Sequence, residues 1–210
     1  SKPYVKSCRP KYPFHYWQID HIDLNTLEKG RKKLNKGYNY ILVVIDIFSK
    51  FVYLYPCKKK SMDEVSTILQ KLFLSGDIPE IIGADRAFSN SSTQTDYIKN
   101  NFILLCHRFH VQIRPGKPYS PQTQGFVERV NGTIKNLIAF HFKKHDNYQW
   151  FDLLDNVAFT YNNTKHSVTK QTPFLLHRGR NIQIQNDNSN QDAIDNTPDN
   201  ASFNDISCDE

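Results

Sequence analysis

Three acidic side chains of this 210-residue chain stand at positions where a carboxylate is unusual. Asp20 interrupts an aromatic and β-branched run, Asp85 directly follows a short apolar run, and Glu128 lies among apolar residues with helical spacing. Carboxylates that are brought together repel one another and lose hydration, so such a cluster persists mainly when hard cations hold it. Because oxygen ligands favour Mg²⁺ or Mn²⁺ over softer metals, the three acids predict a divalent-cation site. Taken singly, each could instead be a strand-end, turn or helix-surface charge.

The segments around these acids alternate between strand-like and helix-like patterns. Runs of aromatic and β-branched residues predict strands at 16–24, 38–48, 51–55, 80–84 and 111–113. The first three follow one another closely, so we expect an antiparallel meander that Pro56 closes. Alternation with helices implies a mixed sheet flanked by helices, which is an α/β fold.

Several segments have the sequence signals of helices. Ser61 can cap a helix that ends at Gly76, because Glu64 follows the cap by three residues. Apolar residues at spacings of three and four predict further helical segments at 97–105, 126–142 and 150–161. The Pro- and Gly-rich segment 114–121 predicts a loop before the long helix.

The charge is divided unevenly along the chain. Residues 181–210 hold seven acidic and no basic side chains, so residues 1–180 carry a formal +13 within the overall +6. A basic domain favours a polyanionic partner, because neutralised phosphates release condensed counterions. Nucleic acid is therefore the expected partner, although a basic surface can also serve only solubility. The runs 31–33 and 58–60 could follow phosphates or be merely solvated.

Composition suggests three parts and excludes some classes of protein. We expect an N-terminal extension over 1–14, one catalytic core over 15–180, and a disordered acidic tail over 181–210, which is too polar to bury a core. The longest apolar run, Ile41–Ile45, is far too short to span a membrane, so no membrane partner is expected. The four cysteines are widely separated, which argues against a zinc knuckle or a dense disulfide framework.

Several blocks of this sequence resemble the catalytic core of retroviral and retrotransposon integrases. They are Trp17–Asp20, Asp85 after its apolar run, and the highly specific block Tyr119–Asn131. Residues 161–167 and 172–180 are similar to the end of the same core in gypsy-type retrotransposon and Maverick/Polinton-type integrases. The likeness covers roughly residues 10–180 and implies a ribonuclease-H-like fold with a mixed five-stranded sheet flanked by helices.

The resemblance also implies an activity, a cofactor and catalytic residues. Asp20, Asp85 and Glu128 would be the catalytic residues and would bind two Mg²⁺ or Mn²⁺ ions. Members of the family cut near the 3′ end of their element's DNA with water and then use the 3′-hydroxyl to attack target DNA. Two metal ions can lower the pKa of the attacking group and neutralise the leaving oxygen. The implied enzyme is a polynucleotidyl transferase and endonuclease that works in the nucleus, as a homo-oligomer, on element ends and target DNA.

Four residues would contact the DNA end by the same resemblance: Tyr119, Gln124, Asn131 and Lys135. Gln124 and Lys135 are four residues before and seven after Glu128, so the three share one helical face. Lys135 could equally be a solvated surface lysine.

The segment after Asp85 departs from the family's pattern. Members usually continue with Asn-Gly and an acid-Phe pair, whereas this chain continues with Arg86, which could compete for the carboxylates. The 42 residues between Asp85 and Glu128 exceed the family's usual spacing, so we expect an insertion between 89 and 110.

Two alternative functions therefore remain open: a domesticated core that binds DNA or protein without cutting, and a ribonuclease H that acts on RNA–DNA hybrids. The block before Glu128 favours the integrase. Two nearby acids are not assigned to the site, because Asp46 follows a buried strand and is interpreted as structural, and Asp23 should face the opposite side of its strand from Asp20.

Overall fold

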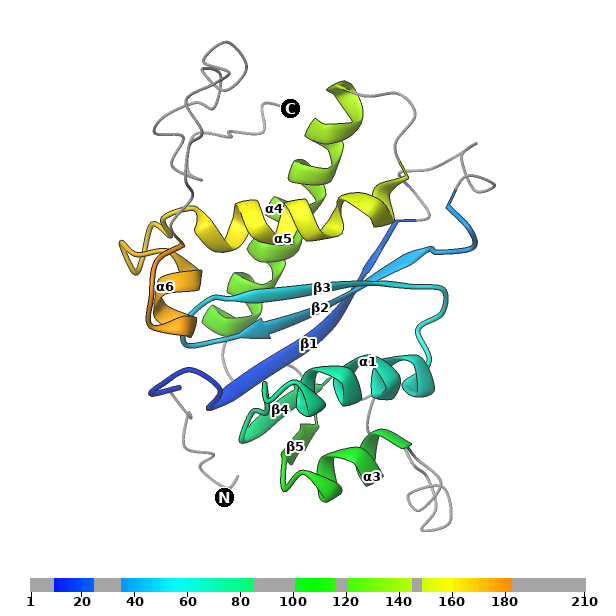
Figure 1. Cartoon of the computed structure of the whole chain (residues 1–210), viewed down its shortest axis with the longest axis vertical. Helices are drawn as coiled ribbons and strands as arrows, with labels where there is room; N and C mark the ends of the chain where they lie inside the picture. The colour runs from blue at the N-terminus through cyan, green and yellow to red at the C-terminus, as the bar shows by residue number, and fades with distance from the viewer. Residues whose placement is uncertain (1–9, 25–34, 85–100, 116–120, 145–148, 183–210) are drawn as a thin grey trace.

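The computed structural model describes residues 10–24, 35–84, 101–115, 121–144 and 149–182 (Figure 1). The strands are β1 (Tyr16–Asp23), β2 (Tyr40–Asp46), β3 (Val52–Cys57), β4 (Ile81–Ala84) and β5 (Gln112–Pro115). The helices are α1 (Met62–Leu74), α3 (Asn101–Arg108), α4 (Pro121–Lys144), the short 3₁₀ helix η2 (Trp150–Leu153), α5 (Leu154–Asn163) and α6 (Pro173–Arg178). Among these residues no helix is both long and apolar enough to cross a membrane.

The five strands form one mixed sheet in the order β3-β2-β1-β4-β5. The pairs β1–β2 and β2–β3 are antiparallel, whereas β4 is parallel to both β1 and β5. This topology confirms the predicted meander and the mixed five-stranded sheet. It also makes β1, which carries Asp20, the central strand.

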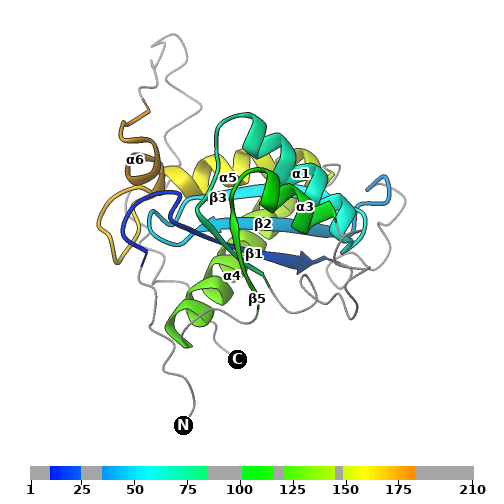
Figure 2. The same cartoon turned by 90° about the horizontal axis from the view of Figure 1, so that it is seen from below.

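Helices cover both faces of the sheet, and alternation along β1 assigns its side chains to one face or the other. Trp17 and Ile19 belong to the apolar cluster that includes α1 and α3. Tyr16 and Ile22 belong to the cluster that includes α4, η2 and α5. Figure 2 shows α4 on the opposite side of the sheet from α1 and α3. Asp20 therefore faces α4, whereas Asp23 faces α1, as the sequence predicted.

The capping signal at Ser61 positions α1 as expected. The Ser61 hydroxyl accepts a hydrogen bond from the Glu64 amide at 3.4 Å. The Glu64 carboxylate does not complete a reciprocal capping box, because its two oxygens accept from the amides of Lys58 and Lys59, each at 2.9 Å. The carboxylate thus fixes the chain that connects β3 to α1.

Two prolines lie inside strands where the sequence predicted an end or a loop. β3 continues through Pro56, which pairs with Ile41, and β5 includes Arg114 and Pro115. Both strands are at the edges of the sheet, where a missing amide hydrogen leaves no ladder partner unsatisfied. β5 therefore continues two residues into the segment that was predicted to be a loop.

α6 is a short helix that periodicity did not predict. Thr172 caps it by accepting from the Leu175 amide at 3.2 Å, and Pro173 occupies its first turn. Gly179 ends it with a left-handed φ of 70°. The predicted acidic tail lies outside the described residues except for 181 and 182, and the proposed domain boundaries stay predictions.

Candidate active site

Asp20 sits on the central strand, partly buried, on the face that α4 covers. Its Oδ1 accepts a hydrogen bond from the amide of His21 at 2.8 Å. Its Oδ2 accepts from the Nδ2 of Asn131 at 2.8 Å, across 111 residues of sequence. The carboxylate is therefore held in one orientation by both the strand and the helix.

Asn131 joins β1 to α4 at the site. Because an ionised carboxylate can only accept hydrogen bonds, the amide nitrogen of Asn131 must face Asp20. Its carbonyl oxygen Oδ1 is then buried without a hydrogen-bond partner in the described part of the chain. A buried acceptor without a donor costs free energy, so this oxygen fits a group that the structure does not contain, such as metal-bound water or DNA.

Glu128 lies one helical turn before Asn131 on α4, with its side chain exposed. Its Oε1 accepts from the Nε2 of Gln124 at 3.1 Å. This bond confirms that Gln124 and Glu128 share a helical face. The exposed Lys135 follows Asn131 by four residues on the same face.

The buried face of α4 determines how this helix packs against the sheet. Val127, Val130, Ile134 and Ile138 are buried against the sheet in the cluster that contains Tyr16 and Ile22. Because the apolar face packs against the sheet, the polar face formed by residues 124, 128, 131 and 135 lies on the side of α4 where Asp20 is found. The helix period and the sheet alternation together bring the two acids to one region.

Two of the predicted site residues, Asp85 and Tyr119, lie outside the described residues, as do Arg86 and the basic run 31–33. β4 ends at Ala84, the residue before Asp85, and runs parallel to β1 as its direct neighbour. Within the described residues, no group of three or more His, Cys, Asp or Glu side chains is placed to hold a metal ion.

The donor chemistry nevertheless fits a hard divalent cation. Asp20 and Glu128 offer carboxylate oxygens, and Asn131 offers the buried amide oxygen described above. Such all-oxygen surroundings suit Mg²⁺ or Mn²⁺.

Gly83 of β4 pairs with Gln18 of β1 and leaves room for two β1 side chains to lie over β4. A Cβ at this position would collide with the Tyr16 hydroxyl and with the Gln18 side-chain oxygen. Those two side chains share the face of Asp20, and the Tyr16 hydroxyl donates to the Gln18 Oε1 at 3.1 Å. Only glycine leaves room for this polar pair at the base of the site.

Asp46 is a buried structural acid, in agreement with its interpretation from the sequence. Its Oδ1 accepts from the amide and hydroxyl of Ser49 at 2.7 and 2.9 Å. Its Oδ2 accepts from the Phe14 amide at 2.6 Å and the Trp17 indole at 3.2 Å. With four donors and no exposed surface, this carboxylate has no room for a metal ion.

His177 of α6 completes this cluster, and its partners could not be predicted from the sequence. Its Nδ1 lies 3.1 Å from the Ser49 hydroxyl and its Nε2 lies 2.9 Å from the Tyr53 hydroxyl. The Tyr53 hydroxyl in turn donates to the carboxylate of Asp77. This carboxylate also accepts hydrogen bonds from the two terminal guanidinium nitrogens of Arg178. Burial lowers the pKa of His177 to about 4, although Asp46 opposes this effect.

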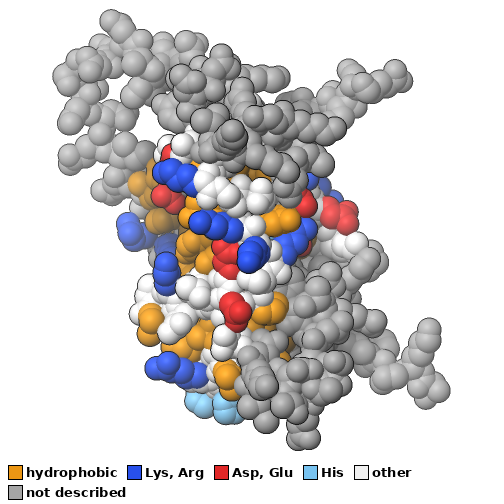
Figure 3. Space-filling model, turned by 90° about the vertical axis from the view of Figure 1, so that its right-hand side faces the viewer, with side chains coloured by type: hydrophobic (Ala, Val, Ile, Leu, Met, Phe, Trp, Pro, Cys, Tyr) orange, Lys and Arg blue, Asp and Glu red, His pale blue; other side chains and the backbone are white. Residues whose placement is uncertain are grey.

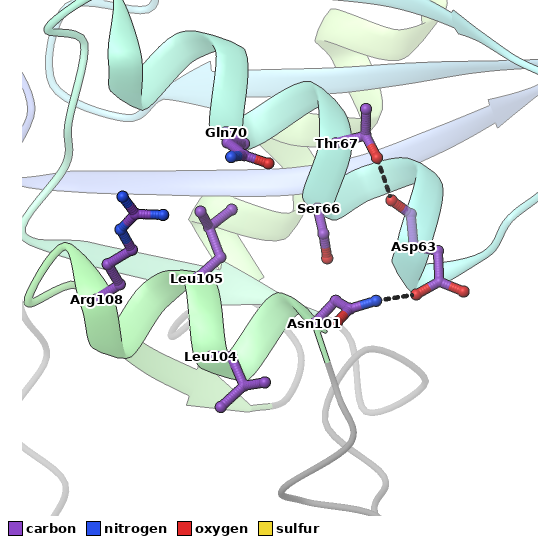
Figure 4. Close-up of a pocket in the computed structure, with 8 residues that line it drawn as sticks. All are labelled: Asp63, Ser66, Thr67, Gln70, Asn101, Leu104, Leu105 and Arg108. Atoms are coloured by element: carbon purple, nitrogen blue, oxygen red, sulfur yellow. Dashed lines mark hydrogen bonds between the residues drawn. The ribbon is translucent and has the colours of Figure 1, made fainter.

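A surface hollow between α1 and α3 lies away from these acids. Figure 4 shows its lining, in which Asn101 donates to the Asp63 carboxylate at 2.7 Å and Arg108 lies at the other end. α1 and α3 pack on the sheet face that Asp20 does not share. The hollow is therefore not part of the candidate active site.

Comparison with known proteins identifies relatives of this arrangement. Residues 10–121 match the family model described as integrase core domain. The Pro-Pol polyprotein of Simian foamy virus type 3 (strain LK3) is 33% identical over 194 residues, which are 92% of this chain and 15% of that polyprotein. The Transposon Tf2-3 polyprotein of Schizosaccharomyces pombe (strain 972 / ATCC 24843) is 32% identical over 148 residues, 69% of this chain and 10% of that polyprotein. The chain thus spans a small part of these relatives.

A solved structure has the same fold. The HTLV-2 integrase catalytic core domain, in complex with magnesium and in a trimeric form, superposes with a TM-score of 0.60 at 24% identity. The match covers 80% of this chain and 99% of that one. The sheet and its flanking helices are therefore those of an integrase catalytic core.

Proposed function

Because this chain belongs to the integrase core domain family, we propose that it is a polynucleotidyl transferase that processes the 3′ ends of an element's DNA and joins them to target DNA. Both reactions are phosphoryl transfers at a phosphodiester. In this proposal Asp20, Asp85 and Glu128 are the catalytic residues and hold two Mg²⁺ or Mn²⁺ ions. The HTLV-2 core in complex with magnesium supports the choice of metal.

One observation carries the proposal: the 2.8 Å hydrogen bond from Asn131 to Asp20. It joins the central strand to the helix that bears Glu128, one turn from that acid. Two acids that are far apart in sequence thereby come to one side of the sheet. β4 supports the assignment of the third acid, because it is the parallel neighbour of β1 and ends immediately before Asp85.

The side chains of this chain would orient the reacting groups. Asn131 fixes the carboxylate of Asp20, and Gln124 steadies that of Glu128 at 3.1 Å. Bound divalent ions would activate the attacking water or 3′-hydroxyl and neutralise the leaving oxygen. Lys135, on the same face, would pair with a DNA phosphate, and Tyr119 would contact the DNA end as the family resemblance implies.

A basic surface at the far end of β1 supports DNA as the substrate. The Lys58 ammonium lies 5.4 Å from the ring centroid of Tyr38, and that of Lys60 lies 4.9 Å from the ring of Tyr40. Lys60 also pairs with Asp23 at 3.6 Å. Figure 3 shows the side of the molecule that lies to the right in Figure 1, where Lys and Arg side chains are interspersed with Asp and Glu. The ammonium groups of these lysines suit contact with the phosphates of a sugar-phosphate backbone.

The partners follow from the reaction. Joining two ends of one element requires more than one active site, so we propose that the chain works as a homo-oligomer on element ends and target DNA. The trimeric and dimeric forms of the HTLV-2 core support self-association. We also propose that the target is chromosomal DNA, which makes the nucleus the site of action.

The test is strand transfer of a labelled DNA end into a plasmid with Mn²⁺, with the flanking segments of the parent polypeptide present. We expect joining by the wild type and at least a 1,000-fold loss, on the order of the catalytic contribution of such groups, in Asp20→Asn and Glu128→Gln. Asp155→Asn, an exposed acid on α5, is the matched control and should join normally.

Each alternative function has its own result in this assay. Cleavage of RNA–DNA hybrids without DNA joining would reassign the chain to ribonuclease H. Metal-independent DNA binding without any cleavage would identify a non-catalytic core.

A further inference from the structure

Lys50 occupies an unusual position in the turn between β2 and β3. Its backbone has a φ of 70°, a conformation that favours glycine, so the turn itself does not call for a lysine. Its ammonium lies 4.3 Å from the ring centroid of Phe126 on α4 and donates to the carbonyl of Ile47 at 2.7 Å. Burial lowers the pKa of Lys50, and nearby Arg129 lowers it further, against the opposing effect of Asp46.

Two more basic side chains, His166 and Arg129, lie near Lys50, close enough to interact electrostatically with it or with each other. His166 packs edge-on against Phe126, with 5.9 Å between ring centroids. The His166 Nδ1 accepts from the amide of Val168 at 3.3 Å, which leaves Nε2 as an N–H donor. The guanidinium of Arg129 lies back along the helix, with Nη1 3.5 Å from where a Cβ on Gly125 would stand.

The charges of this group are not balanced by the described residues. Across the described ranges no acidic side chain lies within ion-pair distance of Lys50 or Arg129. Asp46 is the acid that acts most on Lys50, but its two oxygens already accept four hydrogen bonds. The positive charges of half-buried Lys50 and exposed Arg129 repel each other, and a bound anion would remove that cost.

We propose that Lys50, Arg129 and His166 form a site for one backbone phosphate of the DNA substrate. The three groups come from three separate elements and offer a point charge, a planar fork of donors and a neutral N–H, which together suit a phosphodiester. Arg129 directly follows Glu128 on α4, and because consecutive helix side chains point about 100° apart, the bound phosphate would lie on the strip of the helix next to the catalytic face. The inference rests on the proposed function, because it takes DNA as the substrate.

The test measures binding of a DNA end to the full chain in EDTA, where chemistry is absent. Lys50→Met keeps the apolar stem over Phe126 and removes the charge, so affinity should fall about tenfold, as expected for one charge-assisted contact. The slope of log K against log salt should become shallower by about one. Lys50→Arg should restore both values. Lys71→Met, an exposed lysine on α1, is the matched control and should change neither beyond its long-range charge effect.

A double variant shows whether one phosphate is shared. Arg129→Gln alone should also weaken binding about tenfold, and it keeps the inference testable if Lys50→Met unfolds. Because both side chains contact the same group, the double variant should lose clearly less than the product of the two single losses. Strictly multiplicative losses, or single variants that bind like the wild type, would overturn the site. If the wild type joins DNA normally in that case, the proposed function stands; if it binds no DNA, both fail.

Discussion

His177 should make the stability of this fold depend on pH. The ring is buried between the hydroxyls of Ser49 and Tyr53 and stacks on Phe51 at 4.3 Å between ring centroids. Protonation would place a charge in this buried cluster, and burial therefore lowers the pKa of His177 from 6.5 to about 4. In the unfolded chain His177 is protonated below about pH 6.5, whereas in the folded chain it is protonated only below about pH 4. Stability is thus lost as the pH falls through this window.

The two pKa values determine the size of the loss. Between pH 7.5 and pH 5.0, proton uptake by the unfolded state alone should lower the free energy of unfolding by about 2 kcal/mol. Half-buried His21 and His166 also have pKa values lowered mainly by burial, so they act in the same direction and must be separated from His177.

Urea unfolding of the wild type and His177→Gln at both pH values makes this separation. Glutamine can still bond to a hydroxyl but does not titrate, so the pH-dependent loss should be smaller in the variant by about 2 kcal/mol. His107→Gln, at an exposed position on α3, serves as the matched control and should keep the wild-type dependence. An identical pH dependence in the wild type and His177→Gln would refute the reasoning.

Two further variants test the hydrogen bond from Asn131 to Asp20 and the close packing at Gly83. Asn131→Leu removes the donor to Asp20, so it should lower strand transfer about 10- to 100-fold and raise the Mn²⁺ concentration that the reaction requires. Stability should be nearly unchanged, because the substitution also removes a buried unpaired oxygen. Normal strand transfer by this variant would exclude a positioning role for Asn131. Gly83→Ala should lower the free energy of unfolding in urea by about 1–3 kcal/mol, because the new methyl group would collide with Tyr16 and Gln18. Gly132→Ala on α4 is the control: its methyl group meets no atom within 4 Å, so it should not destabilise the fold. Equal effects of the two substitutions would contradict the steric argument.

Local patterns were sufficient to predict the elements that carry the site. The run around Asp20 predicts a strand because it is rich in aromatic and β-branched residues. The structure buries its odd- and even-numbered side chains on two different faces. The spacing of Val127, Val130 and Ile134 predicted the long helix, and with it the shared face of Gln124 and Glu128. These predictions depend on the composition of a short run and on the 3.6-residue helix period, both of which can be recognised from residues that are close together in the sequence.

Contacts between distant segments could not be predicted in this way. The bond from Asn131 to Asp20 depends on how deeply α4 packs against the sheet, which many side chains decide together. α6 has a Thr cap, a Pro in its first turn and a terminal Gly, but its six residues are too few for a period to appear. The partners of His177 lie 124 and 128 residues before it, so no local pattern could identify them.

The cluster around Asp46 also limits how short a working fragment can be. The Asp46 carboxylate accepts a hydrogen bond from the amide of Phe14, near the beginning of the described fold, and contacts His177, near its end. Both ends of the described fold therefore pack at the same buried carboxylate. A fragment cut after α5 would retain every assigned acid of the active site but would open Ser49 and Tyr53 to solvent. The smallest unit suited to expression and crystallisation therefore extends through Arg178, well beyond residue 121, where the family match ends.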